Sequence, residues 1–374
     1  MNSATKGMDK EINKANQFTY IIGNNGVGKS LKLELDAQLE SKRTDVVVIS
    51  SGLSDKFTWG GTTKLRKAGS YTYLGNRTVG NAIHINTISA NATLNYVQCL
   101  KRQTQGAFLN LLSDIGFDRR IGIMPREVRK RKNIEQASFE PAELSMDFVA
   151  ANEAVLSNKA KPFDLVLTKK NGLPMQFAKF SSGEQNMISM ALKILSRRAS
   201  NVIFYIDEPE ISLHLEWQLS WPKLMHELIV DFSGCKFIVA THSPVMIVSA
   251  LTSGATCYNM CSDRLLRRIN SSELNIEALM FGEFHTLTPH NKAIYEQYAH
   301  VLHMALNYAN STIAGGHDVA QAGRIEREVD KLIEKAHAVS ALLQDKSELI
   351  QSVKEFEGAI EELMTRAAKG EGRL

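Results

Sequence analysis

The sequence predicts an α/β protein with a mixed, mainly parallel sheet. Short apolar runs at 18–22, 45–50, 201–206 and 236–240 have the length and composition of buried strands. Helical patterns such as 186–198 lie between them, and strands that alternate with helices usually pair in parallel. A glycine-rich loop at 23–30 joins the first run to a helix, which gives a strand–loop–helix unit.

The loop at 23–30 reads GNNGVGKS and fits the phosphate-binding pattern G-x-x-x-x-G-K-[ST] at all its fixed positions. Its glycines let backbone N–H groups turn toward phosphates, and the following helix N-terminus adds partial positive charge. We expect Lys29 to reach the β- and γ-phosphates and Ser30 to hold Mg²⁺. The nucleotide-binding residues expected here are Asn24, Asn25, Gly26, Val27, Gly28, Lys29, Ser30 and Leu31.

Polar residues follow two other predicted strands. The stretch NVIFYIDEPE at 201–210 ends in Asp207, placed to hold Mg²⁺, and Glu208, placed to accept a proton from an attacking water. The alternative is a strand that ends in a solvated acidic turn. The stretch KFIVATHSP at 236–244 delivers His242 to the same sheet edge, where we expect a contact to a γ-phosphate. The predicted catalytic residues are therefore Lys29, Glu208 and His242.

The stretch FSSGEQ at 180–185 stands shortly before the acidic strand. Ser182, Gly183 and a following helix N-terminus can form a second anion site. Such turns are common, so its position before the acidic strand is what gives it weight.

In this order, GNNGVGKS, FSSGEQ, IDEPE and THS resemble the P-loop, signature, Walker B strand and switch histidine of ABC-type ATPase heads. The string DEPEISLH and a signature ending in GEQ are most similar to the non-transporter branch. That branch contains SMC-like, RecF-like and OLD-like ATPases and bacterial anti-phage defence ATPases of the Septu type.

The resemblance implies a head that binds ATP and Mg²⁺ and dimerises head to tail around two nucleotides. Assembly into higher oligomers is an alternative that the sequence leaves open. The signature residues Ser181, Ser182, Gly183 and Glu184 would then contact the nucleotide of the partner copy. The resemblance also implies a glutamine that contacts Mg²⁺, for which Gln98, Gln103 and Gln105 are candidates.

The resemblance leaves three functions open. The first is an ATP-hydrolysing switch subunit that controls a separate effector, a nuclease or toxin, in anti-phage defence. The second is a RecF-like, ATP-dependent DNA-binding repair protein. The third is a scaffold that binds ATP with negligible turnover.

The predicted organisation has four parts. An ATPase head is formed by 1–99, which includes the P-loop, and by 164–290, which holds the signature, the acidic strand and His242. A helical insertion is expected at 100–163 and a C-terminal helical region at 291–374. Within the second part of the head, 164–169 and 176–180 are expected to pair as a hairpin across Asn171 and Gly172.

Composition and charge favour a cytoplasmic globular protein. The 374 residues are 44% hydrophobic and 22% charged, and no apolar run has the length of a membrane-spanning helix or a secretion signal. The four cysteines form no zinc-binding spacing. The net charge of +4 is mild, but 119–133 carries seven basic residues against one acid. This run fits nucleic-acid binding, a solvated helix face or docking of an acidic protein.

Overall fold

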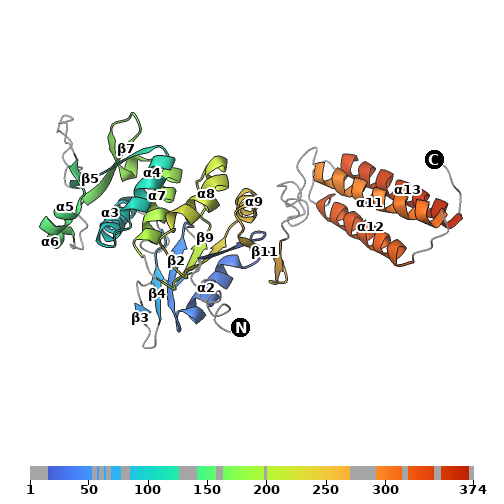
Figure 1. Cartoon of the computed structure of the whole chain (residues 1–374), viewed down its shortest axis with the longest axis horizontal. Coiled ribbons are helices and arrows are strands. Elements are labelled where there is room, and N and C mark those ends of the chain that lie inside the picture. The colour runs from blue at the N-terminus through green and yellow to red at the C-terminus, as the bar shows by residue number, and fades with distance from the viewer. Residues whose placement is uncertain are drawn as a thin grey trace, which may run out of the picture. The chain divides into compact units, whose positions relative to one another are not determined.

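The computed structural model describes residues 16–52, 57–58, 63–64, 69–76, 85–125, 141–156, 163–197, 200–269, 292–313, 319–340 and 347–369. The chain forms two compact units, residues 1–269 and 270–374, which are drawn in Figure 1. Every motif singled out in the sequence belongs to the first unit.

Unit 1 is built on a sheet that has eight strands within the described residues. In spatial order they are β12 (Leu266–Arg268), β11 (Thr256–Met260), β1 (Gln17–Ile22), β10 (Lys236–Ala240), β9 (Ile203–Asp207), β2 (Asp45–Ser50), β4 (Ser70–Tyr73) and β3 (Thr63–Lys64). The strands from β11 to β4 run parallel, and β12 and β3 are antiparallel to their neighbours. The prediction of a mixed, mainly parallel sheet is confirmed.

Successive side chains of a strand point to opposite faces of a sheet. The central strands here are continuous apolar runs, so both faces of the sheet are apolar. On one face, Ile21 and Tyr205 pack with Leu33 and Ala37 of α2 (Lys29–Glu40). On the other face, an aromatic ring of β1 contacts α8 (Leu215–Leu228): the Tyr20 and Trp221 rings lie edge to face, with their centres 6.2 Å apart. Figure 1 shows α8 and α9 (Pro244–Thr252) on the side of the sheet opposite α2.

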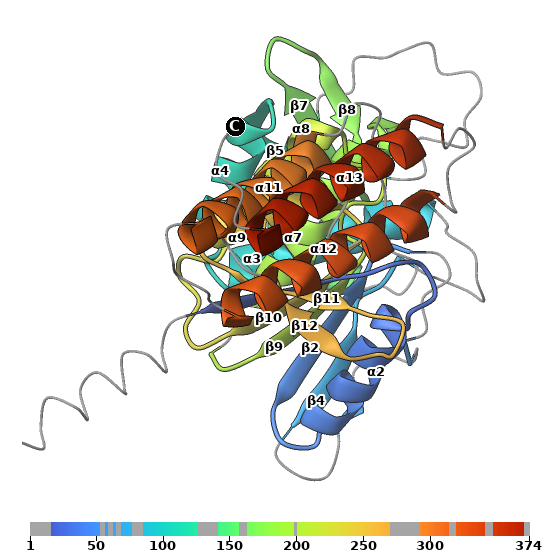
Figure 2. The same ribbon diagram turned by 90° about the vertical axis from the view of Figure 1, so that its right-hand side faces the viewer.

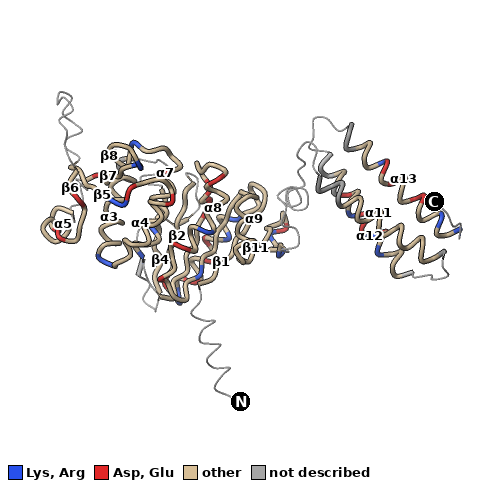
Figure 3. Tube along the Cα trace, turned by 45° about the horizontal axis from the view of Figure 1, so that its top comes forward, with Lys and Arg blue, Asp and Glu red and all other residues tan. Residues whose placement is uncertain are grey.

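Three further helices of unit 1 pack together, namely α3 (Ile85–Lys101), α4 (Gln105–Asp114) and α7 (Ser182–Leu195). Figure 2 gives a second view of the sheet with α2 along it. Lysine, arginine and acidic residues are spread along the described elements (Figure 3).

A smaller antiparallel sheet adjoins these helices. It has the order β6 (Ala142–Glu143), β5 (Phe117–Pro125), β7 (Phe163–Lys169) and β8 (Pro174–Gln176). The β7–β8 pair confirms the predicted hairpin, although 177–179 continues as a short 3₁₀ helix, η2 (Phe177–Lys179), rather than as strand.

The expectation of a helical insertion at 100–163 is wrong for β5, which is a strand. Buried Ile121 and Ile123 pair with Leu167 and Leu165 of β7, so tertiary pairing decides the conformation of this segment. The insertion does contain helices, among them α5 (Met146–Ala151) and α6 (Glu153–Leu156). Arg119 and Arg120 of the basic run lie exposed on β5, and 126–133 lies outside the described residues.

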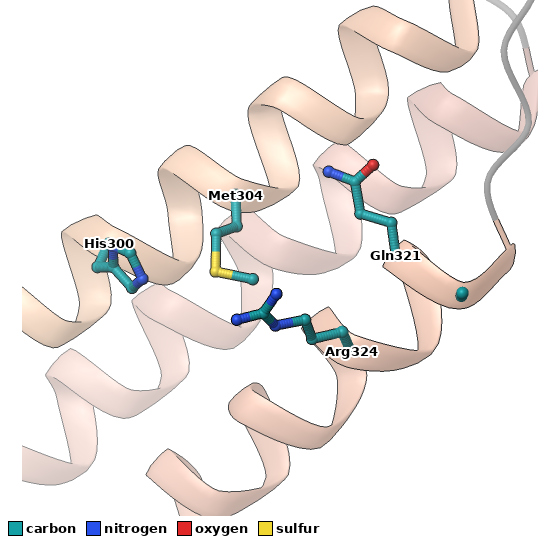
Figure 4. Close-up of a pocket in the computed structure, with 5 residues that line it drawn as sticks. His300, Met304, Gln321 and Arg324 are labelled. Carbon is teal, nitrogen blue, oxygen red and sulfur yellow. The ribbon is translucent and has the colours of Figure 1, made fainter. Parts of the chain in front are cut away.

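Unit 2 contains the long helices α11 (Lys292–Ile313), α12 (Val319–Ser340) and α13 (Ser347–Lys369). They enclose an apolar core in which the Tyr298 and Phe356 rings stack at 4.3 Å. A hollow of about 570 Å³ lies between α11 and α12, and Figure 4 shows Met304 and Arg324 beside it. Within the described residues, no helix combines the length and apolarity needed to cross a bilayer.

Candidate active site

The predicted site residues converge because their strands are parallel neighbours. Ile21 of β1 pairs with Ala240 of β10, Ala240 pairs with Asp207 of β9, and Asp207 pairs with Ser50 of β2. The carboxyl ends of parallel strands meet at one sheet edge, where α/β proteins bind ligands. The loop after β1, the acids after β9 and His242 after β10 therefore share one edge.

The loop at 23–30 has the backbone that its sequence requires. Gly26 and Gly28 have φ angles of 82° and 102°, in a region that side chains disfavour. A Cβ atom on Gly23 would lie 2.5 Å from the carbonyl oxygen of Met260 in β11. The loop is thus held against β11, and α2 begins directly at Lys29.

Lys29 is 5% exposed, and its ammonium is bound within the site. Its Nζ donates to the carbonyl oxygens of Gly23 at 2.7 Å and Asn24 at 3.2 Å, and lies 3.1 Å from Nδ1 of His242. Burial lowers the pKa of Lys29 to about 8, against the opposing charges of Asp207, Glu210 and Glu208. The ammonium therefore remains mostly protonated at neutral pH.

The imidazole of His242 is neutral under the same conditions. Burial and the charge of Lys29 lower its pKa to about 4. Because Nδ1 receives the Lys29 proton, we assign the ring proton to Nε2, which lies 3.6 Å from Oε1 of Glu208. The structure thus places the three predicted catalytic residues, Lys29, His242 and Glu208, in one chain of close contacts.

Two carboxylates at the end of β9 differ in exposure. Asp207 is 2% exposed, whereas about a third of the Glu208 side chain is exposed. Glu208 has a φ angle of 52°, in the left-handed region, and its N–H donates to the Ala240 carbonyl at 2.9 Å. Of the two carboxylates, that of Glu208 is therefore the more accessible to water.

The site offers oxygen ligands of the kind that Mg²⁺ prefers. Ser30 at the start of α2 supplies a hydroxyl, and Asp207 supplies a carboxylate. The hydroxyl of Ser50, the register partner of Asp207, is buried without a hydrogen-bond partner among the described residues. These donors fit a magnesium site.

The signature forms the N-terminus of α7. The Ser181 hydroxyl accepts the Glu184 N–H at 3.3 Å, and the Glu184 carboxylate accepts the Ser181 N–H at 2.9 Å, which is a capping box. Ser181 and Ser182 are exposed, whereas Gly183 is buried against the Ser212 carbonyl. Among the described residues, no hydrogen bond or ion pair joins Ser181–Glu184 to the P-loop of the same chain.

Sequence reasoning missed several residues that hold this site together. Oε1 of Glu210 accepts the backbone N–H of His242, while its Oε2 is buried without a partner among the described residues. Burial raises the pKa of Glu210. The signal was available, because Glu210 is the last acid of IDEPE. Asn186, one turn into α7, donates to the Pro209 and Ile211 carbonyls and so ties α7 to the loop after β9.

None of the candidate glutamines directly follows a described strand of the large sheet. Gln98 is in α3, Gln105 is in α4, and Gln103 is in the turn between these helices. Asn76, which follows β4, donates its N–H to the Ser50 carbonyl at 3.1 Å and accepts from Lys193 at 2.7 Å. Asn76 is therefore joined to the sheet edge that carries Asp207, the register partner of Ser50.

Among the comparisons with known proteins, the match to a family model is the one that indicates an ATPase. A family model described as an AAA ATPase domain matches residues 90–247, which include the signature, the acidic strand and His242 but not the P-loop. The SMC head domain from Thermotoga maritima is similar over 69% of this chain and 92% of its own, at 14% identity and a TM-score of 0.35. A metal-chelate type ABC transporter in an inward-facing conformation is similar over 72% of this chain and 78% of its own, at 15% identity and a TM-score of 0.31. No curated protein matches the chain in sequence.

The chain thus has the α/β fold of a P-loop ATPase, with a mainly parallel sheet covered by helices. The family match and the converging residues of the sheet edge support binding and hydrolysis of ATP.

Proposed function

We propose that this protein is an ATP-hydrolysing switch whose two copies close head to tail around two Mg·ATP molecules. One observation carries the proposal. Each chain has a P-loop with its acids and histidine at one sheet edge, while its signature helix presents exposed serines that do not contact that P-loop. An exposed helix N-terminus binds anions, and a γ-phosphate held by a second copy would satisfy it.

The side chains would divide the work of phosphoryl transfer to water. Lys29 would neutralise the β- and γ-phosphates, and Ser30 and Asp207 would hold Mg²⁺, which supplies charge neutralisation when it is bound. Glu208 would accept a proton from the attacking water, and His242 would contact the γ-phosphate. Positioning and charge supply the catalysis, since phosphoryl transfer needs little covalent help from the protein.

The proposal extends to control of a separate effector, a nuclease or toxin, in anti-phage defence. This extension is based on the resemblance of DEPEISLH and FSSGEQ to the non-transporter ATPases, which include anti-phage defence ATPases. Unit 2 is a compact helical body with its own apolar core, and all three predicted catalytic residues belong to unit 1.

Substitution of Glu208 by Gln tests the switch. The amide keeps the side chain's size but cannot take a proton, so we expect ATP to trap a dimer that light scattering after gel filtration detects. Phosphate release should fall by at least about 100-fold. Lys29→Ala is the matched control and should abolish both the dimer and the release. Parent-like hydrolysis by Glu208→Gln would remove Glu208 from the role of base.

Phosphate release and a DNA-binding assay separate the other two functions. A scaffold would dimerise with ATP but release phosphate no faster than the Lys29→Ala control. A RecF-like clamp would bind duplex DNA with an affinity that depends on ATP and falls steeply with salt. Arg119 and Arg120, exposed on β5, are the described part of the basic run that would contact such DNA.

A further inference from the structure

The Glu184 carboxylate stands at the helix terminus that is proposed to bind a phosphate. Its Oε2 accepts the Ser181 N–H at 2.9 Å, which stabilises the first turn of α7. This hydrogen bond uses one of the N–H groups at the N-terminus of α7, and it holds a negative charge beside that terminus. Burial raises the pKa of Glu184, but hydrogen bonds from Lys169 and Ser181 outweigh it and hold the pKa below its ordinary value. The carboxylate is therefore ionised at neutral pH.

An ionised carboxylate at this position would repel the triphosphate. The side chain of Glu184 is only 13% exposed, so solvent screens its charge less than it would that of a surface residue. The negative charge of Glu184 therefore weakens anion binding at the N-terminus of α7, unless a nearby cation neutralises that charge.

Lys169 supplies that cation. Its Nζ lies 2.6 Å from Oε1 of Glu184, the oxygen that the capping box leaves free. Both carboxylate oxygens therefore have partners, one with Ser181 and one with Lys169.

The small antiparallel sheet holds this lysine in place. Lys169 is the last residue of β7, where it pairs with Phe117 of β5, and its Nζ lies 6.0 Å from the centre of the Phe117 ring. That ring also meets Phe180 edge to face at 5.1 Å, directly before the signature serines. Gln185 adds three bonds from its amide to the carbonyls of Phe177, Ala178 and Phe180.

We propose that Lys169 is a positioning residue of the signature. Its ammonium cancels the charge of the Glu184 cap, so that the N-terminus of α7 can accept the γ-phosphate of an ATP held by a second copy. The inference rests on the proposed head-to-tail dimer and adds a residue of the small sheet to that site. It also gives the small sheet a direct electrostatic link to nucleotide binding.

The test compares three variants in the Glu208→Gln background, where ATP is expected to trap the dimer. Lys169→Met should raise the ATP concentration for half-maximal dimerisation by about tenfold, the effect of one charge on another about 10 Å away at an effective dielectric constant of about 20. Adding Glu184→Gln to Lys169→Met should restore the parent value to within about twofold, because Gln retains the capping box without the charge. Glu184→Gln alone should need no more ATP than the parent.

Matched controls separate charge from packing. Lys169→Arg keeps the cation and should behave as the parent does. The defect of Lys169→Met should shrink as salt rises from about 50 mM to 500 mM, because salt screens repulsion but does not repair packing. Thermal unfolding of each variant shows that the fold is retained.

The outcomes are distinguishable. A Lys169→Met variant that dimerises like its parent, a double variant as weak as Lys169→Met, or a Glu184→Gln variant weaker than its parent would each overturn the role of Lys169 and leave the dimer standing. Absence of any ATP-dependent dimer in the Glu208→Gln parent would overturn the proposed function and this inference with it.

Discussion

Binding of ATP should change the protonation of Lys29. In the free protein the ammonium is buried, and its pKa falls from an ordinary value of 10.5 to about 8. A bound triphosphate would bring several negative charges to Nζ and raise that pKa to its ordinary value or above. About half of the free protein would then carry uncharged Lys29 at pH 8, about a tenth at pH 7 and about nine-tenths at pH 9. We therefore expect ATP binding to take up about 0.1 proton at pH 7, about 0.5 at pH 8 and about 0.9 at pH 9.

Calorimetry measures this uptake directly. The heat of ATP binding, taken at one pH in buffers of different ionisation enthalpy, varies linearly with that enthalpy, and the slope is the number of protons bound. Glu208→Gln is the protein to use, because it binds ATP without turnover under the proposed mechanism. Lys29→Arg is the matched control, since a guanidinium stays protonated across this range and the uptake should vanish.

Two results would refute the reasoning. Uptake below about 0.1 proton at both pH 8 and pH 9, with ATP still bound, would show that the free ammonium is already fully protonated. Unchanged uptake in Lys29→Arg would assign the proton to another group.

Substitutions at three other residues follow from the structure. In Gly183→Ala the new Cβ would lie 2.5 Å from the Ser212 carbonyl, so α7 must shift; urea unfolding should show a loss of about 1–3 kcal/mol, and ATP-dependent dimers should be lost. The pKa of His242 is lowered to about 4, so its contribution to stability is present above pH 6.5 and is lost as pH falls toward 4; urea midpoints of His242→Gln should lack this part of the pH dependence. Glu210→Ala leaves the half-buried N–H of His242 without its acceptor and should cost about 1–2 kcal/mol in urea unfolding, whereas Glu210→Gln keeps an acceptor and should cost less; equal losses would contradict the assignment.

The strands that carry the site could be predicted because their sequences fit a buried strand better than any other element. Runs such as 45–50 are apolar on both faces and too short for a buried helix, so they fit a parallel sheet covered by helices. The P-loop was predictable for a different reason. Gly28 adopts a left-handed φ and Lys29 must reach back to the loop, so a geometric demand fixes each residue of the pattern.

Strand β5 could not be read from the sequence. Its exposed Arg119 and Arg120 stand side by side, and the pairing with β7 shifts register between Phe117 and Ile121, so the alternation of apolar and polar residues is broken. Its strand conformation depends on Leu165 and Leu167, which lie more than 40 residues away along the chain. Local pattern carries no information about such a partner.

The role of Glu184 shows the same limit for the candidate site. Its position three residues after Ser181 predicts a capping box. Its ion pair with Lys169 joins a helix terminus to a strand end and appears only when the small sheet is folded.

The contacts of Lys29 explain how nucleotide and switch residue can act on each other. In the free protein its ammonium is satisfied by the Gly23 and Asn24 carbonyls and by Nδ1 of His242. A γ-phosphate that binds Lys29 would compete for these three N–H groups, and the bond to His242 is one of those it could displace. Loss of that bond would release Nδ1 as an acceptor, and the negative phosphate would offset the Lys29 charge that lowers the pKa of the ring, so the imidazole would become easier to protonate. An imidazole that gains a proton next to a phosphate becomes its donor. Through this 3.1 Å contact, binding of ATP at Lys29 would change the protonation of His242 within a single copy of the chain.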